Sequence, residues 1–209
     1  MKKLLLATAA AGVVGFGMAT PASAALTLGV ELSEPGYASV YQTSTSTADV
    51  FVGSYGTYSE NIDANTVSTD PLSIDLNSTT VSTTTGGTLT ITVSVSGLTS
   101  PIGVEEFISQ VTGHLVTGSG TVTMSAYIDD NDELYATTTP LASSLTVGDS
   151  GSDFATTTSP FSLTEVFTVS ATGPADFSFD GSTVLPEPIS LTLLGSGLVG
   201  LGMVRRRRA

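Results

Sequence analysis

Apolar side chains alternate with hydroxyl-bearing side chains through most of this chain. In the clearest run, 88–96, Leu89, Ile91, Val93 and Val95 fall on one side, and Thr or Ser falls on the other. This two-residue period is typical of a half-buried β-strand. Gly, Pro, Asp and Asn interrupt the runs, and no long stretch of the body has the helical period. The pattern therefore predicts an all-β fold.

Other candidate strands have the same composition, and short Gly- or Ser-rich segments join them. Many short strands without crossover helices favour an antiparallel β-sandwich, with a jelly roll as the neighbouring alternative. The segment 104–111 fits a strand or a short helix, because its apolar residues also match helical spacing. The further candidates are 26–32, 38–42, 49–52, 72–76, 113–117, 121–128, 161–170 and 175–179.

Glu165 interrupts the apolar face of one candidate strand. Strict alternation places it on the same side as Leu163 and Phe167. A carboxylate that faces a core needs a hydroxyl, a backbone amide, a metal or a proton as its partner. A β-bulge near Glu165 that turns Val166 inward avoids this cost, and we expect the bulge.

The basic residues lie only at the two ends, at Lys2, Lys3 and 205–208. Between residues 25 and 184 the chain has eighteen carboxylates, no Lys or Arg, and His114 as its one histidine. A formal charge of −18 repels nucleic acid and attracts cations. The chain has no cysteine, so no disulfide contributes to its stability. We expect no nucleic-acid partner.

The first 24 residues have the composition of a secretory signal peptide. Lys2 and Lys3 precede an apolar run, and the small residues Ala22 and Ala24 place cleavage before Ala25. An uncleaved membrane anchor is the alternative. Export through the Sec translocon and cleavage by signal peptidase are expected, so one β-domain is assigned to 25–184.

The last 25 residues, 185–209, form a second distinct segment. Pro186, Glu187 and Pro188 precede an apolar stretch at about 189–204, and Arg205, Arg206, Arg207 and Arg208 follow it. A helix of this length measures roughly 24 Å, which is slightly short for a membrane span, and arginines can anchor its cytoplasmic end. A plain anchor that is never cleaved is the alternative to a processed signal.

This order of Pro-Glu-Pro, Gly-containing apolar helix and Arg cluster, together with an N-terminal signal peptide, resembles the PEP-CTERM sorting signal of bacterial exported proteins. The same motif is sometimes named after ice-binding proteins, but this chain does not sustain regular Thr-x-Thr ranks. The resemblance implies recognition and processing by an exosortase, transient residence in the inner membrane, and delivery to the cell surface or an exopolysaccharide matrix.

An acidic cluster between two candidate strands is the strongest candidate for chemistry in the body. It consists of Asp129, Asp130, Asn131, Asp132 and Glu133. Such oxygen ligands suit calcium, but the spacing does not match an EF-hand loop. Asp and Asn also favour turns, so a solvated hairpin tip is the simpler interpretation. We expect no other cofactor.

Catalysis has little support in the sequence. There is no Cys nucleophile, and His114 alone cannot form a histidine metal cluster. Glu105 and Glu106 are the candidate carboxylates of a glycoside hydrolase, although no Trp is present to stack on a sugar. We expect a non-enzymatic surface or matrix protein linked to exopolysaccharide, with a calcium- or glycan-binding adhesin module and then an exported hydrolase as alternatives.

Overall fold

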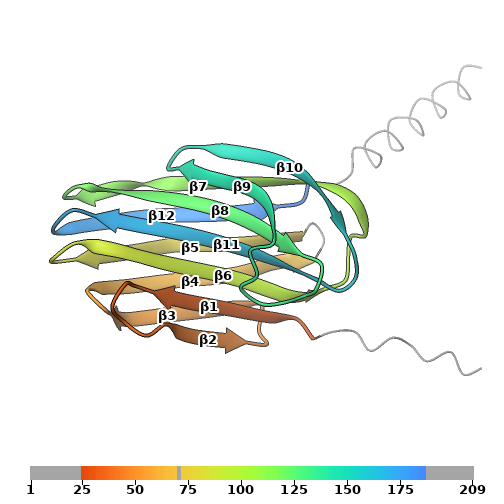
Figure 1. Cartoon of the computed structure of the whole chain (residues 1–209), viewed down its shortest axis with the longest axis horizontal. Helices are drawn as coiled ribbons and strands as arrows, with labels where there is room; N and C mark the ends of the chain where they lie inside the picture. The colour runs from red at the N-terminus through yellow and green to blue at the C-terminus, as the bar shows by residue number, and fades with distance from the viewer. Residues whose placement is uncertain (1–24, 70–71, 187–209) are drawn as a thin grey trace, which may run out of the picture.

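A computed structural model describes residues 25–69 and 72–186, and these residues form two antiparallel sheets that pack face to face (Figure 1). The predicted all-β sandwich is confirmed. Sheet A has the strand order β2-β1-β6-β11-β8-β9, and sheet B has the order β10-β7-β12-β5-β4-β3. The bounds are β1 Thr27–Ser33, β2 Val40–Ser44, β3 Ala48–Tyr55, β4 Tyr58–Thr69, β5 Leu72–Thr83, β6 Gly87–Leu98, β7 Gly103–Thr117, β8 Gly120–Asp129, β9 Thr139–Thr146, β10 Ser150–Thr157, β11 Phe161–Ala171 and β12 Ala175–Val184.

The last eight strands have the connectivity of a jelly roll. β5 pairs with β12, β6 with β11, β7 with β10 and β8 with β9, all antiparallel. This is the nesting obtained when one long hairpin is rolled into two sheets. β1 and β2 then extend sheet A beside β6, and β3 and β4 extend sheet B beside β5. The domain is therefore a β-sandwich in which strands β5 to β12 have the jelly-roll order that was named as the alternative.

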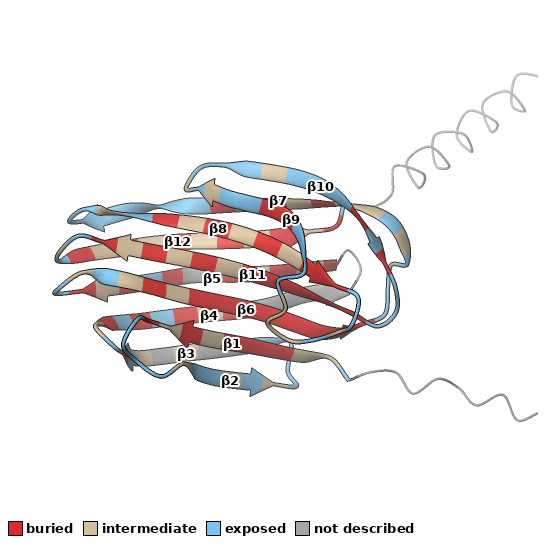
Figure 2. Ribbon diagram, viewed as in Figure 1, coloured by how far each residue is buried: buried red, intermediate tan, exposed pale blue. Residues whose placement is uncertain are grey.

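The core lies between the sheets and is built by the alternation that the sequence predicts. Leu89, Ile91, Val93 and Val95 of β6 are fully buried, and Figure 2 shows buried and partly exposed residues alternating along the strands. Rings from the two sheets meet in the centre, where the centroids of Phe167 and Phe179 lie 5.7 Å apart. Burial of this continuous apolar face is the main source of stability for a domain without disulfides.

Three strands were not predicted, namely β4, β9 and β10. Each carries residues that usually interrupt strands, such as Asn61 and Asp63 in β4, Pro140 in β9 and Gly151 in β10. The ambiguous segment 104–111 is entirely strand and belongs to β7. This segment is a strand because it pairs with β10 on one side and β12 on the other. The sequence of the segment alone carries no information about these partners.

The bulge expected near Glu165 is wrong. The register of β11 against β6 shifts between Phe161 and Leu163, and from Leu163 onward the pairing is regular. Glu165 is fully buried in the core, and Val166 is half-buried on the outer face of sheet A. Strict alternation is kept because the neighbours Leu163 and Phe167 bury more apolar surface than a flipped register would.

Both ends of the described chain leave the domain at the same end, on the right of Figure 1. The backbone N–H of Leu185 donates to Leu72 O at 2.9 Å, which holds the last described residues against β5. None of the described residues forms a helix that could span a membrane. The predicted signal helix and C-terminal membrane helix lie outside the described residues.

Candidate functional site

Asp129 organises the acidic loop that joins β8 to β9. Its carboxylate is buried and accepts hydrogen bonds from the N–H groups of Asn131 and Glu133, each at 3.1 Å, and from the Thr138 hydroxyl at 2.8 Å. Burial alone would raise the pKa of Asp129, but these hydrogen bonds outweigh burial and lower it. The Asp129 side chain therefore serves as an internal cap for the turn.

The neighbouring acidic residues point to separate partners. Asp132 accepts a hydrogen bond from the N–H of Gly97 at 2.6 Å, and Asp130 accepts one from the N–H of Thr158 at 3.4 Å. In the described part of the chain, no group of three or more Asp, Glu, His or Cys side chains is arranged to hold a metal ion. Calcium at Asp129, Asp130, Asn131, Asp132 and Glu133 stays a prediction, and the geometry here is that of a hydrogen-bonded turn.

The same loop lies across the outer face of sheet A. Ser162 Oγ donates to Glu133 O at 2.8 Å, and the N–H of Tyr135 donates to Ser94 Oγ at 3.0 Å. The backbone of Tyr135 has a φ of 65°, which few residues other than Gly and Asn adopt without strain. The loop thus covers the part of sheet A around Ser94 and Thr164, both of which are buried.

Tyr135 of this loop is half-buried. Its ring lies over Gly29 of β1, and its hydroxyl donates to Gln42 O at 3.3 Å. Tyr41 of β2 packs against the ring edge-on, with centroids 5.6 Å apart, and is itself 59% exposed. We call this pair the aromatic ledge.

A carboxylate stands beside the ledge. Glu31 lies directly opposite Tyr41 in the pairing of β1 with β2, so both side chains share the outer face. Hydrogen bonding and the charge of Glu31 raise the pKa of the Tyr41 hydroxyl. The ledge therefore combines an exposed aromatic ring with a strong hydrogen-bond acceptor.

Beyond the ledge, the open part of sheet A presents a flat array of hydroxyl groups. Register places Thr90, Thr168 and Thr123 side by side on three adjacent strands. The Oγ atoms of Thr88 and Ser170 lie 3.3 Å apart. Strand geometry spaces such positions by about 4.8 Å across strands and about 6.7 Å along them. This hydroxyl face consists of Thr88, Thr90, Thr121, Thr123, Ser125, Thr168 and Ser170.

Two carboxyl groups face the core instead of the surface. Neither oxygen of Glu60 or of Glu165 has a hydrogen-bond partner within the described structure. Burial raises the pKa of Glu165 to about 8, and the nearby Thr183 hydroxyl offsets only part of that rise. Burial, followed by the charge of Glu34, raises the pKa of Glu60 to about 7. Both are enclosed by the sandwich and out of reach of a polymeric substrate.

The carboxylates proposed for hydrolysis do not form a pair. Glu105 and Glu106 are consecutive in β7 and therefore point to opposite faces, opposite Ala155 and Phe154 of β10. A glycosidase needs two carboxyls flanking one bond. His114 is exposed on β7 opposite Ser178, so it lies on a strand as expected.

The outer face of sheet B carries a polar hollow. A cavity of about 190 Å³ is lined by Asp75, Asn77, Gln110, Thr112, Asp180 and Ser182. Burial raises the pKa of Asp75, and the charges of Asp180 and Asp63 add to the rise. No aromatic side chain lines this hollow, so it offers hydrogen bonds without a stacking surface.

The sorting residues fall largely outside the described structure. Pro186 is exposed at the end of the described chain, and Ala25 is exposed at its beginning. Glu187, Pro188, Ala22, Ala24, Arg205, Arg206, Arg207 and Arg208 lie outside the described residues.

The aromatic ledge could not be predicted from the sequence. Tyr41 and Tyr135 are 94 positions apart, and the contact depends on a loop that folds back over sheet A. The only local signal is Gly29 within a candidate strand, since a strand glycine often marks the close approach of another group.

Comparison with known proteins gives little further information. No protein-family model matches the chain, and no curated protein matches it. The enzymatically active domain of tailspike protein 4 of bacteriophage CBA120 is 10% identical with a TM-score of 0.32, and the match covers 62% of this chain and 19% of that one. The xylohexaose-complexed CBM22-1–GH10 modules of Clostridium thermocellum xylanase 10B are 12% identical with a TM-score of 0.28, covering 68% and 28%. A mannan-recognising carbohydrate-binding module is 10% identical with a TM-score of 0.25, covering 75% and 89%.

Proposed function

We propose that this chain is an exported, non-catalytic protein of the cell surface or extracellular matrix, and that its β-domain binds polysaccharide at the aromatic ledge. One observation carries the proposal. Tyr41 is 59% exposed, packs edge-on against Tyr135, and stands beside Glu31 at the margin of the hydroxyl face.

This combination suits a sugar chemically. A pyranose ring has an apolar C–H face that packs on an aromatic ring and a rim of hydroxyls that need donors and acceptors. Tyr41 offers the ring, Glu31 the acceptor, and the nearby threonines offer groups that both donate and accept. Because Tyr135 is held by Ser94 and Gln42, the ledge is formed before any ligand arrives, and little entropy is lost on binding.

The charge of the domain restricts the ligand further. With eighteen carboxylates and no Lys or Arg between residues 25 and 186, the domain repels polyanions. We infer that the preferred ligand is a neutral polysaccharide, or one with amino groups. Nucleic acid and heavily sulfated or uronic polymers are poor partners for this field.

The route to the surface is the second part of the proposal. The signal peptide brings the chain to the Sec translocon and signal peptidase, and the segment 189–204 with its four arginines holds it in the inner membrane. An exosortase then acts near Pro186, Glu187 and Pro188, as the resemblance of this segment implies. In this arrangement both ends of the domain face the membrane, because the chain enters and leaves the domain at the same end (Figure 1).

Polysaccharide binding is tested with a panel of soluble neutral glucans, mannans and xylans, using depletion from solution and affinity electrophoresis. The Tyr41→Ala variant should bind about tenfold more weakly, since an aromatic contact contributes roughly 1 kcal/mol or more. Tyr37→Ala is the matched control, because Tyr37 is 50% exposed and packs only against Tyr55 among the described aromatic rings. Equal binding by both variants would remove the ledge as the site.

Export is tested separately by intact-mass analysis in a host that carries an exosortase. The exported protein should begin at Ala25 and lack the four C-terminal arginines. Recovery of full-length protein alone, fixed in the inner membrane, contradicts the processing step but leaves polysaccharide binding open to its own test.

A further inference from the structure

Three large apolar side chains are exposed together at one corner of sheet B. Ile102 is 64% exposed, Val104 is 69% exposed, and Phe154 is 65% exposed. Phe154 lies opposite Glu106 and Thr156 lies opposite Val104, so Phe154 and Val104 are diagonal neighbours on the outer face. We call Ile102, Val104 and Phe154 the apolar corner. Large exposed apolar groups that cluster in this way mark contact surfaces.

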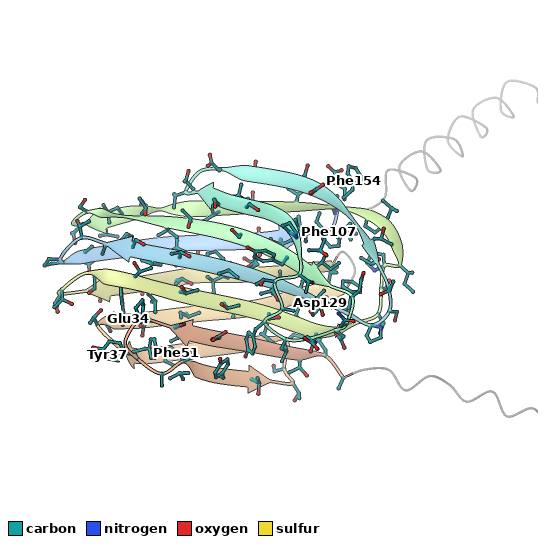
Figure 3. The ribbon with its side chains drawn as sticks, in the orientation of Figure 1. Glu34, Tyr37, Phe51, Phe107, Asp129 and Phe154 are labelled. Atoms are coloured by element: carbon teal, nitrogen blue, oxygen red, sulfur yellow. The ribbon has the colours of Figure 1, made fainter. Side chains whose placement is uncertain are left out.

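The apolar corner continues to the point where the chain leaves the domain. Along β7, Val104 is followed on the outer face by Glu106 and then by Ile108, which lies opposite Val184 of β12. Both Ile108 and Val184 are half-buried there. Pro186 follows two residues later, and Figure 3 shows Phe154 toward the same end of the sandwich, away from Glu34 and Tyr37.

The length of the connecting chain limits how far this corner can lie from the next segment. The apolar stretch begins at Ile189, three residues after Pro186. Three residues span at most about 10 Å even when fully extended. If that stretch is inserted in a bilayer, the corner of sheet B next to Val184 lies at the bilayer surface.

We propose that the apolar corner rests in the interfacial layer of a phospholipid bilayer and fixes the orientation of the domain while the chain is anchored. This inference rests on the membrane anchoring in the proposed function. Phe and aliphatic side chains gain free energy when they are buried at this depth, and a short tether makes the contact nearly intramolecular. The ledge on sheet A then stays free for its ligand, because the corner belongs to the outer face of sheet B.

Charge selects the kind of lipid. Glu106 lies within the strip between Val104 and Ile108, and Asp153 is exposed next to Phe154. These carboxylates are repelled by anionic headgroups, so the corner fits a zwitterionic surface. Contact should weaken as the anionic lipid content rises.

The absence of tryptophan from the chain permits a direct experiment. The Phe154→Trp variant of the chain 25–209 is placed in nanodiscs of phosphatidylcholine, with and without lipids brominated on their acyl chains. Tyr37→Trp is the matched control at the opposite end of the domain. We expect a blue-shifted emission and strong quenching by brominated lipid for Phe154→Trp, neither for Tyr37→Trp, and a loss of quenching when anionic lipid is added.

The outcomes separate the two proposals. If the chain stays with the discs but Phe154→Trp is not quenched, the contact is wrong and the anchoring stands. If the chain does not stay with the discs, the anchoring fails and the contact fails with it. A blue shift that depends on protein concentration assigns the corner to a second copy of the chain. A blue shift that appears without lipid and requires residues 187–209 assigns it to the C-terminal segment. Either result overturns the lipid contact.

Discussion

The ring of Tyr135 occupies the space that a side chain at position 29 would fill. A Cβ on Gly29 would lie 2.8 Å from Cζ of Tyr135, which is closer than carbon atoms approach in folded proteins. The glycine in β1 and the tyrosine in the β8–β9 loop therefore act as one packing unit, and the aromatic ledge depends on both.

We expect Gly29→Ala to displace Tyr135 and to lower the free energy of unfolding by about 1–3 kcal/mol, the usual cost of overpacking. Polysaccharide binding should fall along with stability. Urea unfolding and the binding assay measure the two effects. Gly53→Ala is the control, because a Cβ there meets Phe51 at 3.5 Å, an ordinary contact. An unchanged binding affinity in folded Gly29→Ala would show that the ledge tolerates movement of Tyr135.

Glu165 should make the domain less stable as pH rises. Burial raises its pKa from 4.5 in the unfolded chain to about 8 in the folded domain. The native state then binds the proton more tightly, so the stabilising contribution is complete below pH 4.5 and is lost between pH 4.5 and pH 8. Glu165→Gln removes the titrating group and should raise stability at pH 9 by up to about 5 kcal/mol relative to the unmodified domain.

Urea unfolding curves from pH 4 to pH 9 test this, with Glu133→Gln as the control for an exposed carboxyl. A parallel pH dependence of Glu165→Gln and the unmodified domain would mean that an internal water or ion satisfies the carboxylate.

Glu60 should contribute a second loss of stability over a narrower range. Burial and the charge of Glu34 raise its pKa from 4.5 to about 7, so the loss occurs between those two values and is complete near neutral pH. In Glu60→Gln, the free energy of unfolding should fall less steeply between pH 4.5 and pH 7. The further fall between pH 7 and pH 8, which Glu165 causes, should remain. Titration of the Glu60 carboxyl carbon by NMR gives the pKa directly, and a value near 4.5 would contradict the burial.

Asp129 should act in the opposite direction. Its pKa is lowered, so its stabilising contribution is present above about pH 4 and is lost as pH falls through the folded-state value. Asp129→Ala leaves two backbone N–H groups without their acceptor and should cost about 2 kcal/mol at neutral pH. Asp130→Ala is the control, since Asp130 accepts a single bond at 3.4 Å, and it should cost much less.

Calcium should have little effect on the loop. The oxygens of Asp129 are already engaged by Asn131, Glu133 and Thr138. We expect the melting temperature to be the same in millimolar calcium and in excess chelator. A calcium-dependent rise that disappears in Asp132→Ala would restore the calcium-binding interpretation.

The alternation of apolar and hydroxyl residues was sufficient to predict the fold class, because burial of one strand face is a local property of the sequence. Strand order was not predictable in the same way, since β5 and β12 pair across about a hundred residues. β4 was missed because Asn61 and Asp63 usually favour turns, yet here they occupy the wet face of a long strand. Glu165 was assigned to a bulge because a lone buried carboxylate costs free energy, and the fold tolerates that cost.

The cluster 129–133 was identified from composition, but its role depends on which backbone amides it meets. Those partners are distant in sequence, such as Gly97 near the end of β6 and Thr158 directly after β10. Tyr41 and Tyr135 carried no motif at all, and only the folded loop brings them together.

The confinement of all Lys and Arg to residues 2–3 and 205–208 has a consequence for the resistance of the domain to proteolysis. Proteases of trypsin-like specificity cut after basic residues, so they can trim the ends of the chain and find no cleavable bond between Ala25 and Pro186, whether that stretch is folded or unfolded. This resistance depends on the amino-acid sequence alone, so it is kept when the domain unfolds locally or completely.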